Sequence, residues 1–335
     1  MMKAEAASRI NKIAGLVTID VEPDNVWANT HSECLSNVRA LPAFQELCQN
    51  YGVRPTYLIT FSVAQNRESA NIIEQLLATG HCEVGAHPHL WETPPFSARD
   101  RTGQAWTGSA YETTLLQDKL ATLQSLLKTR FGPATSHRAG RYGLDPRQVA
   151  MLSSLGIIAD TSVTPGLDWT LTGAPDYSSA PLRPYYLSEH SLLVPGDSAL
   201  LEVPCTVRPG VKIGGVEKTR IGKALLGRLG WLPRWLRGSP SATPRELIAT
   251  CVWGKHRVPH LNLMTHSSEL SSGTSPYWKT DDDVKRHLGL CAAVFRWWQD
   301  QGVVPLTLTE FARAFSSEKP TEPWVKNSSP SCRDT

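Results

Sequence analysis

Short β-type runs alternate with helical patterns along almost the whole chain, and this alternation limits the fold more than any other feature. Helical patterns separate most of the predicted strands, and the helix at 243–254 has Thr243 placed to cap it and Pro244 in its first position. The predicted strands are 16–19, 55–63, 82–86, 136–138, 157–160, 200–207, 260–265 and 303–308. Strands joined by helices form parallel sheets, so we expect a closed barrel or a doubly wound sheet.

The first predicted strand ends in the acids Asp20, Glu22 and Asp24. Residues two apart on a strand share a face, so Asp20 and Glu22 point the same way. Pro23 then ends the strand, because it cannot donate to a sheet ladder. Burying two carboxylates together is costly unless a cation or a shared proton relieves their repulsion. A solvated strand exit is the alternative interpretation of this stretch.

Polar residues follow several other predicted strands at the same relative place. In a barrel, the carboxyl ends of the strands meet at one face, where functional residues gather. The residues at these exits are Asp20, Glu22, His87, His89, Arg138, Asp160 and His266. We therefore expect five strand ends to contribute to one pocket.

His87 and His89 are separated by Pro88 on an extended segment, so both imidazoles can face one cation. With one carboxylate they form a ligand set suited to Zn²⁺ or another divalent metal, with coordination positions left open. Such a metal polarises a carbonyl and activates water for hydrolysis.

The composition is that of an ordinary soluble globular protein. The chain has 335 residues, 41% of them hydrophobic and 19% charged, which allows one large domain or two small ones. A formal net charge of +3 gives little indication of partners by itself, and we expect no nucleic-acid partner. The seven scattered cysteines form no CxxC pair and are typical of reduced thiols. The start lacks the apolar core of a signal peptide and no run is long enough to span a bilayer, so we expect a cytoplasmic protein.

Five segments occur in the order of the five motifs of the NodB-type polysaccharide deacetylases (carbohydrate esterase family 4), which the chain resembles over 15–311. It looks most like the subgroup associated with polysaccharide biosynthesis. The segments are TIDVEPD, GHCEVGAHPHLWETPPF, HRAGRYG, ADTSV and LNLMTHSSEL. The resemblance implies a distorted (β/α)7-8 barrel over 10–315, with an insertion at 208–240. We expect the Pro- and Ser-rich end at 316–335 to be a disordered tail.

The resemblance also implies the metal site and the general base. Asp20 matches the catalytic base, and Glu22 matches the metal-binding acid. His87 matches the first histidine ligand. The family commonly has its second histidine four residues later, where this chain has Trp91, so His89 is the expected ligand. Asp24 is the alternative ligand if His89 points away.

Four further residues receive roles from the resemblance. Arg138 matches the arginine that orients the base, and a bidentate pair would keep Asp20 ionised. Tyr142 matches a residue whose backbone N–H binds the developing oxyanion. Asp160 matches the acid of the fourth motif, expected beside Arg138 or His266. His266 matches the histidine that protonates the leaving amine, with a structural core histidine as the alternative.

Three tryptophans, Trp91, Trp106 and Trp169, lie in predicted loops beside the expected site. We interpret them as candidates for stacking on sugar rings, although packing in the core is the better interpretation of any single tryptophan.

The resulting hypothesis is a metal-dependent amidohydrolase that removes the acetyl group from an N-acetylated sugar. The missing signal peptide favours a nucleotide-linked or lipid-linked saccharide of surface polysaccharide biosynthesis. Two alternatives stay open: a carbohydrate-binding protein of the same fold without catalysis, and a related hydrolase of a non-sugar amide.

The segment 208–237 concentrates the basic charge of the chain, with eight Lys or Arg against Glu217 as its single acid. Leucines and tryptophans lie between these charges, as in segments that rest on a membrane surface. We predict peripheral contact of this segment with an anionic membrane. A basic helix packed on the barrel is the alternative.

Overall fold

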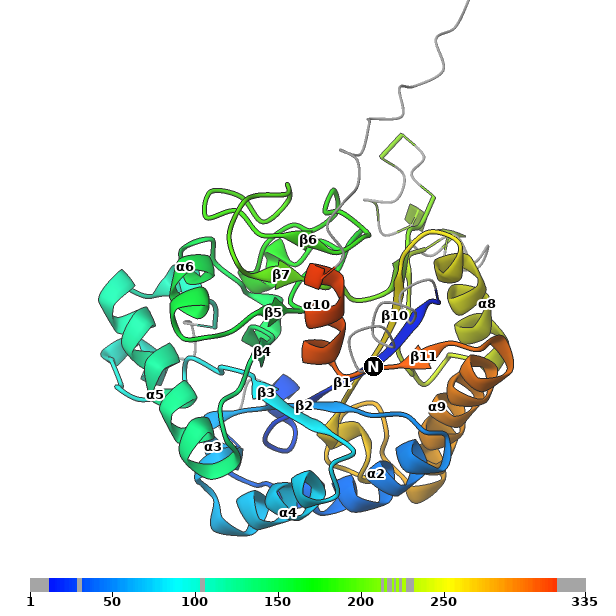
Figure 1. The fold of residues 1–335 in the computed structure, drawn as a ribbon, viewed down its shortest axis with the longest axis horizontal. Helices are drawn as coiled ribbons and strands as arrows, with labels where there is room; N and C mark the ends of the chain where they lie inside the picture. The colour runs from blue at the N-terminus through cyan, green and yellow to red at the C-terminus, as the bar shows by residue number, and fades with distance from the viewer. Residues whose placement is uncertain are drawn as a thin grey trace, which may run out of the picture.

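In the computed structural model, residues 12–28, 32–102, 106–211 and 232–317 are described, together with residues 214, 215, 219, 221, 222, 225 and 226. Nine strands of this described part form one sheet, in the order β10-β1-β2-β3-β4-β5-β7-β6 with β11 beside β1. All neighbours run parallel except β6 and β7. The sheet curls into a partial barrel surrounded by helices, as Figure 1 shows. The predicted distorted α/β barrel is thereby confirmed.

The strands of the barrel are β1 (Ala14–Val21), β2 (Thr56–Ile59), β3 (Glu83–Ala86), β4 (Ser136–His137), β5 (Ala159–Asp160), β6 (Tyr185–Tyr186), β7 (Leu201–Glu202), β10 (His260–His266) and β11 (Val304–Pro305). A separate two-stranded ribbon pairs β8 (Val207–Arg208) with β9 (Arg234–Trp235). The helices are α2 (Leu41–Asn50), α3 (Phe61–Gln65), α4 (Arg67–Ala78), α5 (Thr113–Phe131), α6 (Arg147–Ser154), α8 (Pro244–Lys255), α9 (Asp281–Gln301) and α10 (Leu308–Ser317).

Several predicted strands are longer than the strands that form: the run 200–207, for example, gives the short β7 and, after a break, β8, and two other runs continue as helices. The run 55–63 ends as a strand at Ile59 and continues as α3 from Phe61. The run 303–308 gives only the short β11 before α10 begins at Leu308. In both places an apolar run passes from strand to helix, and hydrophobicity alone does not distinguish the two. The predicted tail lies, beyond Ser317, outside the described residues.

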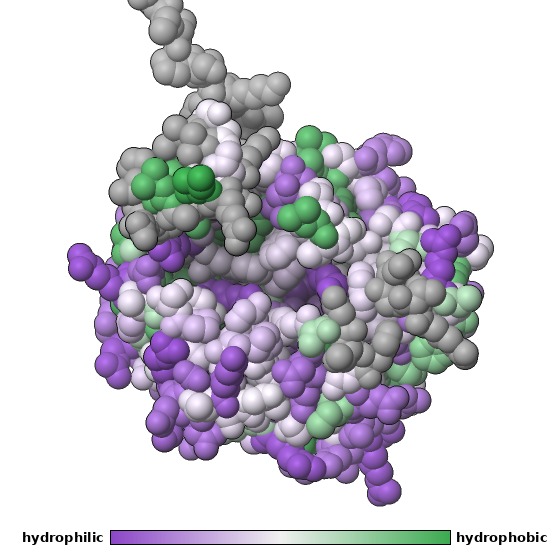
Figure 2. All heavy atoms as spheres, turned by 180° about the vertical axis from the view of Figure 1, so that it is seen from behind, coloured by the Kyte–Doolittle hydropathy of each residue, from purple (hydrophilic) through white to green (hydrophobic). Residues whose placement is uncertain are grey.

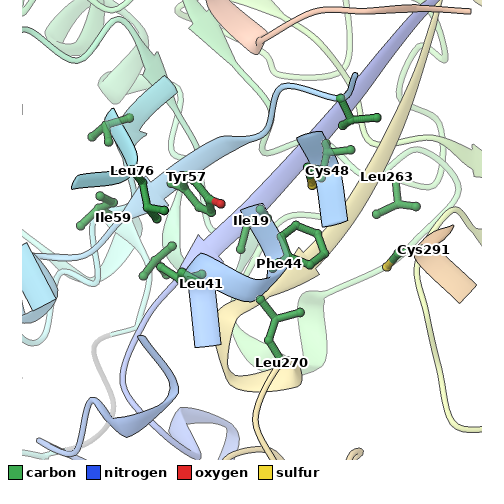
Figure 3. Close-up of a cluster of buried hydrophobic side chains, with 14 of the residues drawn as sticks. Ile19, Leu41, Phe44, Cys48, Tyr57, Ile59, Leu76, Leu263, Leu270 and Cys291 are labelled. Atoms are coloured by element: carbon green, nitrogen blue, oxygen red, sulfur yellow. The ribbon is translucent and has the colours of Figure 1, made fainter. Parts of the chain in front are cut away.

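Strand β1 lies at the centre of the core, and all eight of its residues are buried. A parallel strand covered on both faces needs such a continuous apolar run. Figure 3 shows Ile19 of β1 beside Phe44 and Leu41 of α2 and near Leu263 of β10. On the other side, α10 packs Leu308 and Phe311 against Ala14 and Leu16 at the start of β1. Because α10 covers this end of the barrel (Figure 1), the opposite end is left for a site.

Asp160 does not take the place predicted for it beside Arg138 or His266. Its carboxylate lies 2.5 Å from Nδ1 of His137 and accepts a hydrogen bond from the backbone N–H of Ser162 at 3.0 Å. His137 and Asp160 are register partners on β4 and β5, and Arg138, one residue further along, points to the other face. The alternation of the strand therefore separates Asp160 from Arg138.

Glu202 of β7 completes this buried group. Burial raises the pKa of Glu202 well above its ordinary value, and the neighbouring Asp160 charge adds to the effect. Burial acts in the same direction on Asp160, but the hydrogen bond from His137 outweighs it and keeps the pKa of Asp160 low. Glu202 is thus the protonated member of this buried group.

Glu202→Gln tests this assignment through the pH dependence of stability. The unfolded glutamate has a pKa near 4.5, so above this pH the folded state holds a proton that the unfolded chain has lost. Wild-type stability therefore falls as pH rises above this value. Glutamine stays neutral and keeps a donor, so the variant should lose less stability between about pH 5 and pH 8. Denaturant unfolding at several pH values measures this, and identical pH profiles would contradict the assignment.

Gly15 lies where β1 meets the end of α9, and a Cβ there would lie 2.8 Å from the ring of Trp298 and 2.9 Å from Val303. Overpacking of this kind costs about 1–3 kcal/mol, so we expect Gly15→Ala to lower the free energy of unfolding by that amount. Gly289 within α9 has nothing within 4 Å of its Cβ position, so Gly289→Ala is the matched control. This control should stabilise the protein by about 0.5–1 kcal/mol. Denaturant unfolding of both variants measures these changes in the free energy of unfolding. An unchanged free energy of unfolding for Gly15→Ala would show that Trp298 and Val303 shift to make room for the methyl group.

Candidate metal centre and active site

The carboxyl ends of β1, β3, β4 and β10 bring the predicted site residues together at the end of the barrel opposite α10. Register pairs Asp20 of β1 directly with His266 of β10. His87 and His89 follow β3, and Arg138 follows β4. Figure 2, which views this face, shows a hollow in its middle where hydrophilic residues gather. All of these side chains are buried.

Glu22, His87 and His89 form a group able to hold a metal ion. They offer one carboxylate oxygen and two imidazole nitrogens, and these atoms lie within 4.8 Å of one another. Nε2 of His89 lies 3.2 Å from the Glu22 carboxylate, and Nε2 of His87 lies 3.7 Å from it. The other carboxylate oxygen, Oε1 of Glu22, is buried with no hydrogen-bond partner among the described residues. A divalent cation would satisfy this oxygen, so the residues present fit a metal such as Zn²⁺.

The surroundings of the two histidines fix their rings. Nδ1 of His87 donates to the backbone carbonyl of Arg138 at 2.9 Å, which leaves its Nε2 lone pair toward Glu22. His89 stacks on Trp91 with ring centroids 4.3 Å apart, and its Nδ1 lies 3.8 Å from the carboxylate of Glu92. Burial lowers the pKa of His89, but the nearby carboxylates of Glu22 and Glu92 outweigh burial and raise that pKa to about 9. The group therefore attracts positive charge.

Asp24, the alternative ligand, lies outside this group. Its carboxylate accepts from Oγ of Ser36 at 2.6 Å and from the backbone N–H of Asn37 at 3.1 Å. It also accepts from Nδ2 of Asn37, which in turn donates to the carbonyl of Glu22. Asp24 thus holds the loop after β1 against the 3-10 helix η2 (Ser36–Ala40), and His89 completes the metal group.

Asp20 and Arg138 form the buried ion pair predicted from the motifs. Nη1 of Arg138 donates to Oδ1 of Asp20 at 2.6 Å, and its Nη2 donates to Oγ1 of Thr18, also at 2.6 Å. Its Nε donates to the carbonyl of Thr161 at 3.0 Å. Burial opposes ionisation of Asp20, but the charges of Arg138, His87 and His266 together hold its pKa below the ordinary value. Asp20 is therefore a carboxylate in a fixed position.

The second oxygen of Asp20 faces the two histidines between which a reacting molecule would lie. Oδ2 is 3.7 Å from Nε2 of His87 and 3.6 Å from Nε2 of His266. On its other side, Nδ1 of His266 lies 3.4 Å from Oε2 of Glu269, which also accepts the backbone N–H of His266 at 3.1 Å. Trp27 packs edge-on against the imidazole at 4.2 Å. His266 is thus held between an acid and an aromatic ring.

Sequence reasoning gave Arg237 and Trp27 no place in the site. Arg237 donates to Oε1 of Glu269 at 2.6 Å and lies 3.5 Å from Nδ1 of His266. Its guanidinium also lies 5.6 Å from the Trp27 ring. The spacing of Glu269, three residues after His266, is that of a capping box and is readable from sequence. No sequence pattern marks Arg237. Its contact with Glu269 forms only because the chain returns through β9, which pairs with β8.

The backbone N–H of Tyr142 does not have the freedom that an oxyanion donor needs. Tyr142 lies at the end of the 3-10 turn η5 (Gly140–Tyr142) with φ of +58°. Its N–H donates to the carbonyl of Ala139 at 3.0 Å, within the same turn. The predicted oxyanion role is therefore not supported by this geometry. The buried Tyr142 ring instead stacks on Trp169 at 5.5 Å.

The three candidate sugar-stacking tryptophans differ in what they can offer. Trp91 is buried between His89 and Trp106, so the prediction that it stacks on a sugar is wrong. Trp106 and Trp169 are half-buried. Trp169 uses one face on Tyr142 and donates from Nε1 to Oγ1 of Thr164 at 2.8 Å. For these two, sugar stacking stays a prediction.

The described part of the basic segment gives the membrane prediction no support. Arg237 pairs with Glu269, Arg234 lies 3.2 Å from Glu246, and Leu236 between them is fully buried. Arg208 lies in β8. The side chains of the other basic residues of the segment are not described: Lys212, Lys218, Arg220, Lys223 and Arg228. Within the described chain, no helix is both long and apolar enough to cross a bilayer.

The cysteines in the described part of the chain form no disulfide with one another, which agrees with the expectation of reduced thiols.

The sequence matches no family model and no curated protein. Solved structures do match it along most of its length. A protein from Mycobacterium smegmatis named as a polysaccharide deacetylase is 14% identical, with a TM-score of 0.57 over 94% of this chain and 96% of its own. A protein from Parabacteroides distasonis named as a glycoside hydrolase/deacetylase is 13% identical, with a TM-score of 0.60 over 92% and 73%.

A 4-alpha-glucanotransferase from Thermococcus litoralis also matches, with 11% identity and a TM-score of 0.54 over 92% of this chain and 41% of its own. At these identities the likeness concerns the fold, and the barrel accommodates more than one activity. At the level of the fold, the resemblance indicated by the five motifs is confirmed: this chain has the fold of the NodB-type polysaccharide deacetylases.

Proposed function

We propose that this protein is a metal-dependent deacetylase that hydrolyses the acetamide of an N-acetylated sugar. The observation that carries the proposal is the position of Asp20, ionised by Arg138 and placed between the metal group and His266. A base, a proton donor and a Lewis-acid site within one pocket are the requirements of amide hydrolysis. The motif resemblance adds the sugar substrate and a place in surface polysaccharide biosynthesis.

Each residue has a separate task in this reaction. A divalent cation held by Glu22, His87 and His89 would polarise the acetyl carbonyl and lower the pKa of water. Asp20 takes the proton of the attacking water through its free Oδ2, while Arg138 keeps it ionised and oriented. His266, on the other side of Asp20, delivers a proton to the departing amine. Glu269 holds the imidazole through Nδ1, which leaves Nε2 toward the substrate.

Acetate release from N-acetylated oligosaccharides by the metal-loaded protein tests the function. We expect Asp20→Asn and His266→Ala to lower kcat by about 10²–10⁴-fold while keeping the metal, because they remove proton transfer and not ligands. Asp300→Asn, at the exposed end of α9, makes the same chemical change far from the site and should be silent. Sugar binding without acetate release by the wild type would favour a binding protein. Release from a non-sugar amide alone would favour the second alternative.

The ligand assignment has its own test. We expect His89→Ala to weaken zinc binding as severely as His87→Ala, because each removes one of three ligands. Asp24→Ala should keep the wild-type zinc affinity, because its carboxylate is bonded to Ser36 and Asn37. Calorimetric zinc titration of the three variants gives the comparison. Wild-type affinity in His89→Ala, or its loss in Asp24→Ala, would reverse the assignment.

A further inference from the structure

A fully buried lysine on α5 holds the loop that follows β3. Nζ of Lys119 donates to the backbone carbonyl of Leu90 at 2.9 Å and to that of Thr93 at 2.7 Å. Its third hydrogen bond goes to Oδ2 of Asp100 at 3.2 Å. Lysine is almost never fully buried unless its charge is paired, and here all three donors are used on this part of the chain. The lysine therefore fixes the backbone of the two residues that lie between the two carbonyls.

Those two residues, Trp91 and Glu92, both contact His89. Trp91 stacks on the imidazole with ring centroids 4.3 Å apart. The backbone N–H of Glu92 donates to the carbonyl of His89 at 3.0 Å, and its Oε2 lies 3.8 Å from Nδ1 of the ring. The other oxygen, Oε1, accepts from Oγ of Ser62 at 3.1 Å. The loop thus places a carboxylate beside the ring nitrogen that does not face Glu22.

The two proposed histidine ligands differ in what their Nδ1 atoms bind. Nδ1 of His87 donates to the carbonyl of Arg138 at 2.9 Å. Nδ1 of His89 is buried and has no hydrogen-bond partner among the described residues. A histidine that binds a metal through one ring nitrogen donates from the other, commonly to a carboxylate. The Glu92 carboxylate is in the direction that this donor needs, but about 1 Å beyond hydrogen-bond distance.

The side chain of Glu92 has room to close this gap. It lines a cavity of about 530 Å³, whose walls also include α3 and the chain that follows β1. Ser62 bonds Oε1, so a small rotation of the carboxylate about this bond brings Oε2 toward Nδ1. The backbone can remain where Lys119 holds it during this rotation.

We propose that Glu92 is a positioning residue for the metal centre. When a divalent cation occupies Nε2 of His89, Glu92 accepts a hydrogen bond from Nδ1 and fixes the ring toward Glu22. The inference rests on the ligand set of the proposed function, and it adds a residue to which the motif resemblance gave no role. A carboxylate partner makes an imidazole a stronger ligand, and its loss typically lowers metal affinity by about 10–100-fold.

Calorimetric titration of the metal-free protein with zinc alone tests this inference independently of turnover. Glu92→Leu removes the acceptor and should weaken zinc binding by about 10–100-fold. Glu92→Gln keeps an acceptor oxygen and should lose less affinity. Glu33→Leu is the matched control, because Glu33 is an exposed acid that lines the same cavity, and it should keep the wild-type affinity.

The hydrogen bond also has a spectroscopic signature that a general loss of stability would not produce. In ¹H–¹⁵N NMR spectra of the zinc-loaded wild type, the Nδ1 proton of His89 should have the downfield shift of a hydrogen bond to a carboxylate. In Glu92→Leu this signal should move upfield. The Nδ1 proton of His87 is the internal reference, because it bonds to Arg138 in either case.

The outcomes separate this inference from the proposed function. Wild-type zinc affinity in Glu92→Leu, or an equal loss in Glu33→Leu, would overturn the role of Glu92 and leave the ligand set intact. A His89 signal without the downfield shift in the zinc-loaded wild type would overturn it as well, whether or not the leucine variant folds. Absence of zinc binding by the wild type would overturn the metal centre itself, and with it the proposed function.

Discussion

The buried ion pair between Arg138 and Asp20 is the interaction on which the rest of the site depends. Arg138 also bonds Thr18 and the carbonyl of Thr161, so one fully buried side chain joins β1 to the segment that follows β5. Removing one partner of such a pair leaves an uncompensated buried charge and typically costs about 3–5 kcal/mol. The contact that ties the barrel together at this end therefore also keeps Asp20 ionised and aimed. The stability of this end of the barrel and the ionised state of Asp20, the proposed base, have the same origin here.

The part of the site that the sequence predicted follows from one geometric rule. Parallel strands place their carboxyl ends at one edge, so residues just after predicted strands must meet. Asp20, Glu22, His87 and His89 lie within a few residues of strand ends, and their predicted grouping is confirmed. The barrel itself was predictable because the alternating strand and helix patterns can each be recognised from a short stretch of sequence. Strand lengths were less predictable, as the apolar run at 55–63 shows by continuing into α3.

What could not be predicted depends on contacts and turn geometry that no local pattern records. The partner of Asp160 follows from its register with His137, and the bonded N–H of Tyr142 follows from the turn after β4. Arg237 reaches Glu269 because the chain returns through β9 beside β8. From composition alone it belonged to a basic surface segment. Burial beside an acid changes the meaning of such a residue entirely, and burial is a property of the fold.

The distribution of charge argues for a division of the site that the fold alone does not require. A barrel of this kind also occurs in a glucanotransferase, so the reaction must be argued from the side chains. Around His87 and His89 the carboxylates of Glu22 and Glu92 give an excess of negative charge, which favours a cation, while the charge of Asp20 is balanced by Arg138. Beyond His266, Glu269 is paired with Arg237 at 2.6 Å, which removes that excess. A cation is therefore directed to the group of Glu22, His87 and His89, and not to the acid beside His266.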